Sequence, residues 1–192
     1  MELLSLQSIG SPIVLLCFLL GGFFIVVITI YNGLVAKRNM VRNTFSSIDV
    51  NLKKRSELIP NLVETVKSYA QHEQEVLVSA IELRNKLNHA SSQQERMKLE
   101  GAVSPAVNKL FGLAESYPDL KSHENFLNLQ RTLTEIEEQI SASRRAYNAA
   151  VMAQNNAVES FPSNIIANVF AFKPHEFFEI PESERFNPEV NF

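Results

Sequence analysis

The sequence predicts an all-α protein in which an N-terminal transmembrane helix is followed by a long antiparallel bundle of three to four helices. Between Glu2 and Lys37 the chain carries no charged residue. Beyond that stretch, apolar residues recur about every 3.5 residues over long segments, as in helices that pack along one face in a coiled coil. Glycine and proline are few, at 6 and 8 of 192 residues, which favours helices over strands.

The first element is an apolar stretch from Ile13 to Ile30, which reads IVLLCFLLGGFFIVVITI. At ~1.5 Å rise per residue it spans roughly 27 Å, close to the hydrocarbon thickness of a bilayer. A cleaved signal peptide is the alternative, but it needs a basic start, a shorter core and a small-residue cleavage site. Here the start MELLSLQSIGSP carries an acid instead of a base, the apolar core is long, and no A-x-A cleavage site follows it. We therefore expect residues 1–12 to be a short extracytoplasmic segment and residues 13–31 to be an uncleaved span.

Basic residues cluster directly after this span. The positive-inside rule therefore places the C-terminal body in the cytoplasm, at the inner face of the membrane. Six basic residues lie between positions 37 and 55, against Asp49 alone, and such a cluster suits anionic lipid headgroups. Lys and Arg are not interleaved with aromatic residues, so nucleic acid is not an expected partner. We define the basic collar as Lys37, Arg38, Arg42, Lys53 and Lys54.

The body begins with the longest apolar seam, which runs from Val41 to Ala90. Its period predicts one helix of ~50 residues, roughly 75 Å long. Pro60 lies within it, so we expect a kink there. Alternatively, Ser56 caps a fresh helix after a short break.

Turn signals divide the rest of the body. A polar turn is expected at residues 89–92, then a helix from about Gln93 to Ser116 that is kinked at Pro105, then a last long helix from a cap at residues 122–125 to Phe161. The bundle domain thus covers residues 32–163. Residues 164–192 hold six phenylalanines and three prolines. We expect a short helix at 165–172 and then an extended strap that docks its aromatic side chains on its own bundle or on a neighbouring subunit.

Two charged residues, Arg55 and Glu73, interrupt the long seam. They are 18 residues apart, roughly 27 Å along a straight helix, so they cannot pair with each other there. Each needs a partner on another helix, because an unpaired buried charge is costly. The candidate partners are Glu135, Glu137 and Glu138 for Arg55, and Lys98, Lys109 and Arg131 for Glu73. These positions are interpreted as residues that set the register of the bundle, or as contacts between subunits; Asp49 and the pair Tyr147-Asn148, which repeats Tyr31-Asn32 after 116 residues, join them as candidates.

No catalytic, cofactor or metal site is predicted. His72-Glu73 lacks the second histidine of a zinc peptidase motif, because Val76 stands where it would be. Glycine-rich phosphate loops and nucleophile elbows are absent. The single cysteine, Cys17, lies inside the apolar stretch and cannot form an intramolecular disulfide. We therefore expect no enzyme activity.

Blocks of residues along the whole chain resemble the LemA family. The resemblance implies a bacterial membrane protein with an external N-terminus and a cytoplasmic helical domain, without established catalysis. Some family members are encoded near membrane-bound zinc peptidases, which implies a membrane-protein partner. The polar Asn155-Asn156 stretch departs mildly from the family. The matching blocks are Tyr31-Asn32-Gly33-Leu34-Val35, Ile48-Asp49-Val50, Leu52-Lys53-Lys54-Arg55, Leu58-Ile59-Pro60-Asn61-Leu62-Val63, Tyr69-Ala70, His72-Glu73, Ala114-Glu115, Tyr117-Pro118-Asp119-Leu120-Lys121, Glu124-Asn125-Phe126-Leu127, Leu129-Gln130, Arg144-Arg145, Tyr147-Asn148 and Phe161-Pro162-Ser163-Asn164.

The function expected from these observations is a single-pass scaffold of the inner cell membrane whose helices associate laterally into homo-oligomers. The alternative is an adaptor that presents its helical face or its C-terminal tail to a membrane peptidase or a signalling partner.

Overall fold

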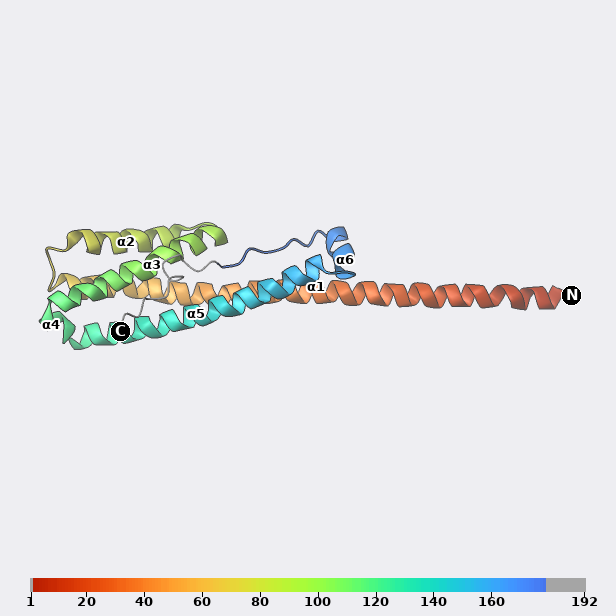
Figure 1. The fold of residues 1–192 in the computed structure, drawn as a ribbon, viewed down its shortest axis with the longest axis horizontal. Coiled ribbons are helices and arrows are strands. Elements are labelled where there is room, and N and C mark those ends of the chain that lie inside the picture. Colours follow the sequence, from red (N-terminus) through yellow and green to blue (C-terminus); the bar gives the residue numbers. More distant parts are fainter. Residues whose placement is uncertain (1, 179–192) are drawn as a thin grey trace, which may run out of the picture. The chain divides into compact units, whose positions relative to one another are not determined.

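The computed structural model describes the backbone of residues 2–178, which is helical apart from short turns and the final segment (Figure 1). No strand occurs within these residues, and a long apolar N-terminal helix packs against other helices, which confirms the predicted all-α class. The elements are α1 (Glu2–Lys67), α2 (Gln74–His89), α3 (Gln93–Leu113), the 3-10 helix η1 (Ala114–Ser116), α4 (Pro118–Lys121), α5 (Glu124–Glu159) and α6 (Ser163–Val169).

The chain divides into two compact units. The anchor unit comprises Met1–Asn43 and Ala149–Glu176, and the bundle unit comprises Thr44–Asn148 and Phe177–Phe192, described here as far as residue 178. Each unit therefore contains one part of α1 and one part of α5.

The anchor unit contains the apolar stretch predicted from the sequence. The N-terminal part of α1 is apolar and long enough to cross a membrane, with a mean hydropathy of 2.7 over an 18-residue window of which nothing is buried. The side chain of Phe18 is 77% exposed and that of Ile25 is 66% exposed. Exposure of such large apolar side chains to water is unfavourable. One helix with the properties of a membrane span is thus present, as predicted.

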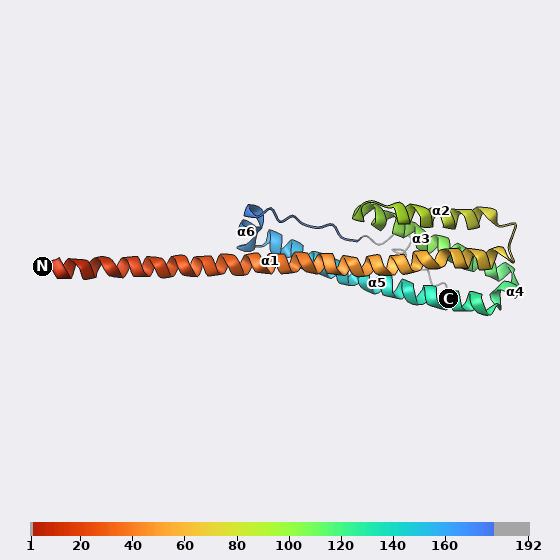
Figure 2. The ribbon, with the colours of Figure 1, turned by 180° about the vertical axis from the view of Figure 1, so that it is seen from behind.

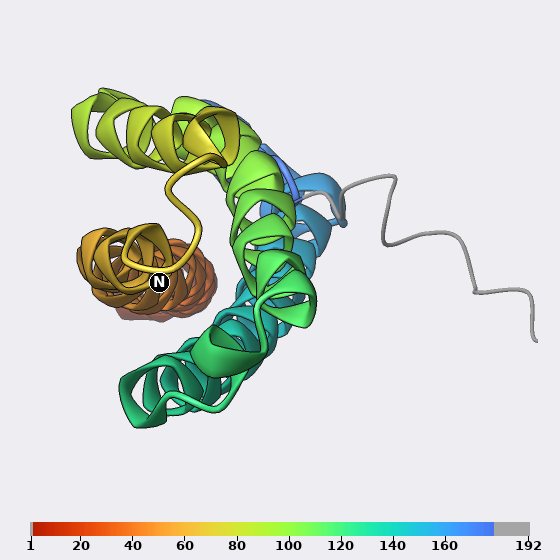
Figure 3. The same cartoon turned by 90° about the vertical axis from the view of Figure 1, so that its left-hand side faces the viewer.

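The bundle unit is built around a continuous apolar core. Helices α2, α3 and α5 form an arc along one side of the α1 segment, as the view along the helices shows (Figure 3). Each helix contributes apolar residues at spacings of three and four, so the seams predicted from the sequence face this core. Its fully buried members include Leu62 and Val66 from α1, Leu110 from α3, Leu120 from α4 and Phe126 from α5.

The expectation of one unbroken helix from Val41 to Ala90 is wrong. Helix α1 ends at Lys67 and α2 begins at Gln74, and the turn between them is closed by bonds such as Ala70 N–H to Val66 O at 2.9 Å. The turn contains neither glycine nor proline, and the apolar period continues in phase across it, so the sequence carries no punctuation there.

Proline does not end α1. The helix continues through Pro60, so the alternative in which Ser56 caps a fresh helix is also wrong. The Ser56 hydroxyl instead donates to Asn88 Oδ1 on α2, at 2.9 Å. Pro105 likewise lies inside α3.

The other predicted boundaries agree closely with the structure. Ser92 caps α3, because its hydroxyl accepts from the Glu95 N–H at 3.1 Å, while the Glu95 carboxylate accepts from the Ser91 N–H at 2.9 Å. The short helix expected at 165–172 is α6, and a residue with a positive φ of 54°, Ala171, ends it.

Helix α6 packs against α1 within the anchor unit (Figures 1 and 2). Beyond its end, the Phe172 N–H donates to Ala167 O at 2.9 Å and the Ala171 N–H donates to Asn168 O at 3.2 Å. This pattern is a Schellman motif, in which a left-handed residue reverses the chain and the next side chain packs back onto the helix. Phe172 is accordingly buried in one cluster with Ala167, Leu34 and Val158.

Candidate functional site

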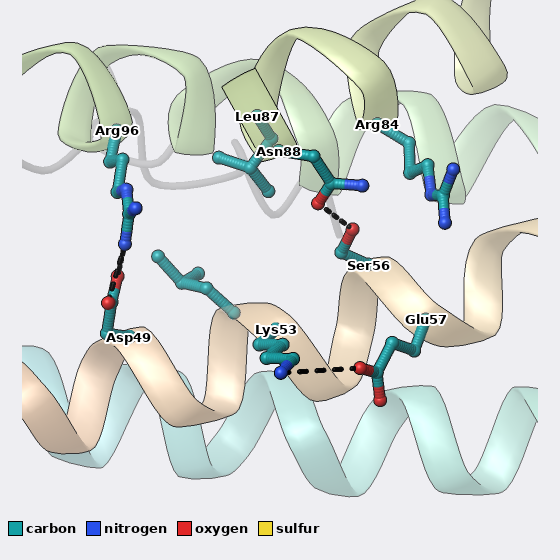
Figure 4. A pocket seen from close by; sticks show the side chains of 9 residues that line it. Asp49, Lys53, Ser56, Glu57, Arg84, Leu87, Asn88 and Arg96 are labelled. Atoms are coloured by element: carbon teal, nitrogen blue, oxygen red, sulfur yellow. Dashed lines mark hydrogen bonds and ion pairs between the residues drawn. The ribbon is translucent and has the colours of Figure 1, made fainter. Parts of the chain in front are cut away.

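A polar groove of about 340 Å³ lies in the bundle unit, between α1, α2 and the start of α3 (Figure 4). Its α1 and α2 residues recur at spacings of three and four, so helical periodicity alone places them on facing surfaces. The lining residues are Asp49, Leu52, Lys53, Ser56, Glu57, Arg84, Leu87, Asn88 and Arg96.

One end of the polar groove is closed by an ion pair between α1 and α3. Arg96 Nη1 lies 2.5 Å from Asp49 Oδ1 and 2.6 Å from Oδ2, and both side chains are 37% exposed. Asp49 is the one acid among the basic residues that follow the apolar stretch, and its partner Arg96 was not predicted from the sequence. Half-exposed pairs of this kind hold two helices in register more than they stabilise the fold.

The remaining charged residues of the groove make weaker contacts. Lys53 and Glu57 are 4.0 Å apart with side chains 76% and 63% exposed, a geometry that contributes little. Arg84 Nη1 donates to Asn85 Oδ1 at 3.3 Å, while its Nε is buried and has no hydrogen-bond partner among the described residues. The groove thus offers cationic donors to a polar or anionic group. Its hydroxyl, on Ser56, donates to an amide oxygen, which is not a general base.

A second polar cluster crosses the core of the bundle unit. Arg55 is 1% exposed and its Nη1 contacts Glu137 Oε2 at 2.6 Å and Ser104 Oγ at 2.9 Å. Ser104 Oγ also lies 3.2 Å from both carboxylate oxygens of Glu137. Of the three glutamates proposed as partners, Glu137 is the one that pairs with Arg55. The cluster connects α1, α3 and α5, and a shift of α1 against α5 would separate the buried Arg55 cation from its carboxylate.

Glu73 does not interrupt a helical seam, contrary to the expectation. It lies half-buried in the turn before α2, because α1 has already ended at Lys67. Its interpretation as a polar seam residue facing Lys98, Lys109 or Arg131 depended on the unbroken helix and falls with it.

Tyr147 and Asn148, the other seam candidates, lie near the end of the bundle-unit part of α5. Tyr147 is buried with its ring centre 5.8 Å from that of Phe45. The Asn148 amide donates to Phe178 O at 3.0 Å and accepts from the Phe178 N–H at 2.8 Å. The Phe178 ring lies under the guanidinium of Arg144, at 4.9 Å. These residues hold the start of the C-terminal strap.

The anchor unit holds the preceding strap residues by similar contacts. The Asn155 amide donates to His175 O at 2.9 Å and accepts from the His175 N–H at 2.8 Å, and Gln154 Nε2 donates to Lys173 O at 3.4 Å. Burial of His175, together with the nearby Arg42 and Arg38 cations, lowers the pKa of its imidazole below 6.5. The strap, as far as residue 178, thus docks on its own chain; residues 179–192 lie outside the described part.

The members of the basic collar differ in their surroundings. Lys37 and Arg42 in the anchor unit, and Lys53 and Lys54 in the bundle unit, have exposed side chains. Arg38 is half-buried, because its guanidinium lies 5.0 Å from the centre of the Phe172 ring. Arg38 therefore supports the strap as well as contributing charge.

Sequence reasoning missed Gln154, Asn155 and Arg144 as strap contacts. The signal available for Arg144 was its place in a block shared with the family, whereas Asn155 was read as a departure from that family. Among the described side chains, no group of three His, Cys, Asp or Glu residues is placed to hold a metal ion.

Comparison with known proteins gives one consistent family. The family model described as "LemA family" matches residues 44–192. "Protein LemA" of Metamycoplasma hominis is 24% identical over 173 residues, which cover 90% of this chain and 79% of that protein. "Magnetosome protein MamQ 2" of Paramagnetospirillum magneticum is 23% identical over 175 residues, which cover 78% of this chain and 64% of that protein. "Magnetosome protein MamQ" of Magnetospirillum gryphiswaldense is 23% identical over 177 residues, 79% of this chain and 62% of that protein, so less than two thirds of either magnetosome protein is matched.

Proposed function

This chain belongs to the LemA family, and on that basis we propose that it is a non-catalytic scaffold, anchored in a bacterial inner membrane by α1 and self-associating at its inner face. The observation that carries the proposal is the exposed apolar stretch at the N-terminal end of α1. In the window that could cross a membrane no residue is buried, so lipid is the environment that would cover this surface.

The proposed orientation rests on the charges that follow the stretch. Lys37 and Arg42 are exposed one to three helical turns beyond Tyr31, where headgroups would lie. The cytoplasmic side carries the anionic lipids that attract such residues, each contributing about 1 kcal/mol near the surface. Lys53 and Lys54 are exposed as well and are available to the same headgroups.

Self-association would use the outer faces of the bundle unit. Val50 and Leu127 are large apolar side chains that remain 54% and 48% exposed there. Lateral contact between copies of the chain would remove these side chains from water.

Anchoring and orientation are tested with the full chain in sealed membrane vesicles. The chain should stay with the membrane after alkaline extraction, and a double substitution Leu19→Arg and Ile25→Arg should release it. For orientation, the single native thiol is removed by Cys17→Ser and a new one is placed at the exposed Ser122 by Ser122→Cys. A membrane-impermeant maleimide added outside inverted vesicles should label it, and labelling only from the opposite side would contradict the orientation.

Self-association is tested by the mass of the detergent-solubilised protein, measured by light scattering. A mass of two or more chains supports the scaffold, and a monomer at all concentrations contradicts it.

Neutralising Arg38, Arg42, Lys53 and Lys54 tests the role of the basic collar. The background is the chain that also carries the two arginine substitutions in α1. The measurement is the salt dependence of its association with vesicles.

The polar groove favours a second candidate function, an adaptor for a membrane protein partner such as a peptidase. Arg84 places at the groove a buried Nε that has no hydrogen-bond partner in the described part of the chain. Arg84→Ala should then remove a co-purifying protein without changing the oligomer mass. Deletion of residues 173–192 separates the two functions further, because an adaptor loses a partner whereas a scaffold with a self-docked strap loses stability or oligomer mass.

A further inference from the structure

Helix α6 and the turn before it expose an apolar patch. Phe161 is 80% exposed and Val169 is 71% exposed, the highest values among large apolar side chains outside the N-terminal stretch of α1 in the described part of the chain. Ile165 at 53% lies one helical turn before Val169, on the same face, and Phe170 at 51% follows. We define these four residues as the α6 patch.

The segment that carries the patch contains no charge. Glu159 and Lys173 are its nearest charged residues, and every residue from 160 to 172 is uncharged. About a quarter of the residues in an average soluble domain are charged, so an exposed, uncharged segment of this length is unusual for a face in contact with water. Four large apolar side chains gathered there indicate a contact with an apolar medium.

The position of α6 shows which apolar medium is close. The Phe170 ring lies 4.8 Å from the ring of Tyr31, centre to centre. Ile30 and Tyr31 pack against the cluster that includes Ala167 of α6. Helix α6 therefore lies beside the turn of α1 at which the apolar stretch ends, as Figure 2 shows.

The depth follows from the sequence of α1. Ile30 is the last residue of the apolar stretch and Tyr31 suits the membrane–water interface. Lys37 lies six residues later, roughly 9 Å further along the helix, where headgroup phosphates would meet it. A structure packed on Ile30 and Tyr31 thus sits at the boundary between acyl chains and headgroups.

We propose that the α6 patch inserts into the bilayer at this boundary and forms a second lipid contact beside the transmembrane part of α1. The inference rests on the proposed anchoring of α1 and adds the depth and the residues of a second contact. The occupant is lipid and not a protein, because the patch adjoins the end of a helix surface that is itself covered by acyl chains. A short apolar helix held parallel to the surface in this way fixes how the anchored chain tilts and rotates.

The absence of tryptophan from the chain makes a direct test available. Single-tryptophan variants of the full chain are reconstituted in phosphatidylcholine–phosphatidylglycerol vesicles that contain lipids brominated near the headgroup or near the chain end. Phe161→Trp probes the patch, and Phe18→Trp, at a position 77% exposed in the apolar stretch, is the membrane control. Val78→Trp, at a position 54% exposed on α2, is the water control. Far-UV circular dichroism verifies that each variant folds.

The proposal predicts that the Phe161→Trp variant emits to the blue of the Val78→Trp variant and loses most of its emission with shallow bromines, and less with deep ones. Red emission without quenching would overturn the proposal. Blue emission without quenching would also overturn it, since protein and not lipid would then cover the patch. If the Phe18→Trp variant is not quenched either, the proposed anchoring fails; if it is quenched and the Phe161→Trp variant is not, only the second contact fails.

Discussion

Different kinds of interaction stabilise the bundle unit and the anchor unit. The bundle unit buries a continuous set of apolar side chains from α1 to α5, and its polar elements add register to a core that is already large. The anchor unit has a smaller apolar cluster, formed by Leu34, Val158, Ala167 and Phe172, and fixes its strap through side-chain amides and Arg38. Non-directional burial therefore dominates one unit, and directional contacts decide the other.

The largest effect on the free energy of unfolding is expected from a substitution that creates a cavity in the bundle unit. Leu62 is 0% exposed in the main cluster, so Leu62→Ala should lower the free energy of unfolding by about 2–5 kcal/mol. Urea unfolding of the detergent-solubilised chain, followed by circular dichroism, measures it. Val78→Ala on the exposed face of α2 is the control and should change the value by less than about 0.5 kcal/mol. Equal losses would contradict the assignment of this core.

The next effect concerns the charge inside that core. Glu137→Ala leaves the buried Arg55 cation without its carboxylate, and we expect a loss of about 2–4 kcal/mol, moderated because Glu137 is 38% exposed. The neighbouring Glu138→Ala removes an exposed charge and should lie within about 0.5 kcal/mol of the parent. Adding Arg55→Met to Glu137→Ala should recover part of the loss, since no unpaired charge is then buried. A purely additive double variant would show that the two residues do not depend on each other.

In the anchor unit, the side-chain amide of Asn155 is expected to stabilise the docked strap. Asn155→Ala removes both hydrogen bonds to the His175 backbone, with an expected cost of about 1–2 kcal/mol confined to the docked strap. Hydrogen exchange at the Phe172 amide should then be faster, while the urea midpoint of the bundle unit stays unchanged. Asn156→Ala, at an exposed position on α5, should leave both measurements as they were. A shift in the bundle midpoint would mean that the strap contributes to both units.

A smaller, stabilising effect is expected from a substitution at the end of α6. Ala171 has a φ of 54°, which costs an L-residue about 1–2 kcal/mol, whereas glycine adopts it freely but loses more chain entropy. Ala171→Gly should therefore slow exchange at the Phe172 amide, by about 0.5–1 kcal/mol. Ala153→Gly, at an exposed position within α5, should destabilise by about 1 kcal/mol. Destabilisation by both substitutions would contradict the conformation of Ala171.

The smallest effect is a pH dependence of the anchor unit. The docked strap lowers the pKa of His175 below 6.5, so the unfolded strap binds more protons and docking weakens as the pH falls below 6.5. Above that value His175 is neutral in both states and contributes no dependence. An NMR titration of the imidazole should show the lowered pKa, and Arg42→Gln should raise it toward the ordinary value. A His175 that titrates unchanged in this variant would exclude the Arg42 cation as a cause.

The same contrast explains what the sequence revealed. Apolar periods predicted the helices and the apolar stretch, and the polar residues 89–92 predicted the turn before α3. The turn before Glu73 was invisible, because the period stays in phase and no glycine or proline marks it. Arg55 was recognised as needing a partner, and three glutamates on one helix were named, but packing alone selects Glu137. The polar groove combines three segments, and the contacts of Asn148 and Asn155 are made to backbone atoms, so neither leaves a pattern along the chain.

One consequence lies in the atoms that Gln154 and Asn155 bind. Both reach main-chain oxygens of the strap, and Asn155 also accepts a main-chain N–H, so the identity of the docked side chains is not read. Lys173 has an exposed side chain and should therefore vary among homologues, whereas Phe172 should not. A fluorophore or an affinity handle attached at Lys173 would report on this chain in living cells without disturbing the docking of the strap.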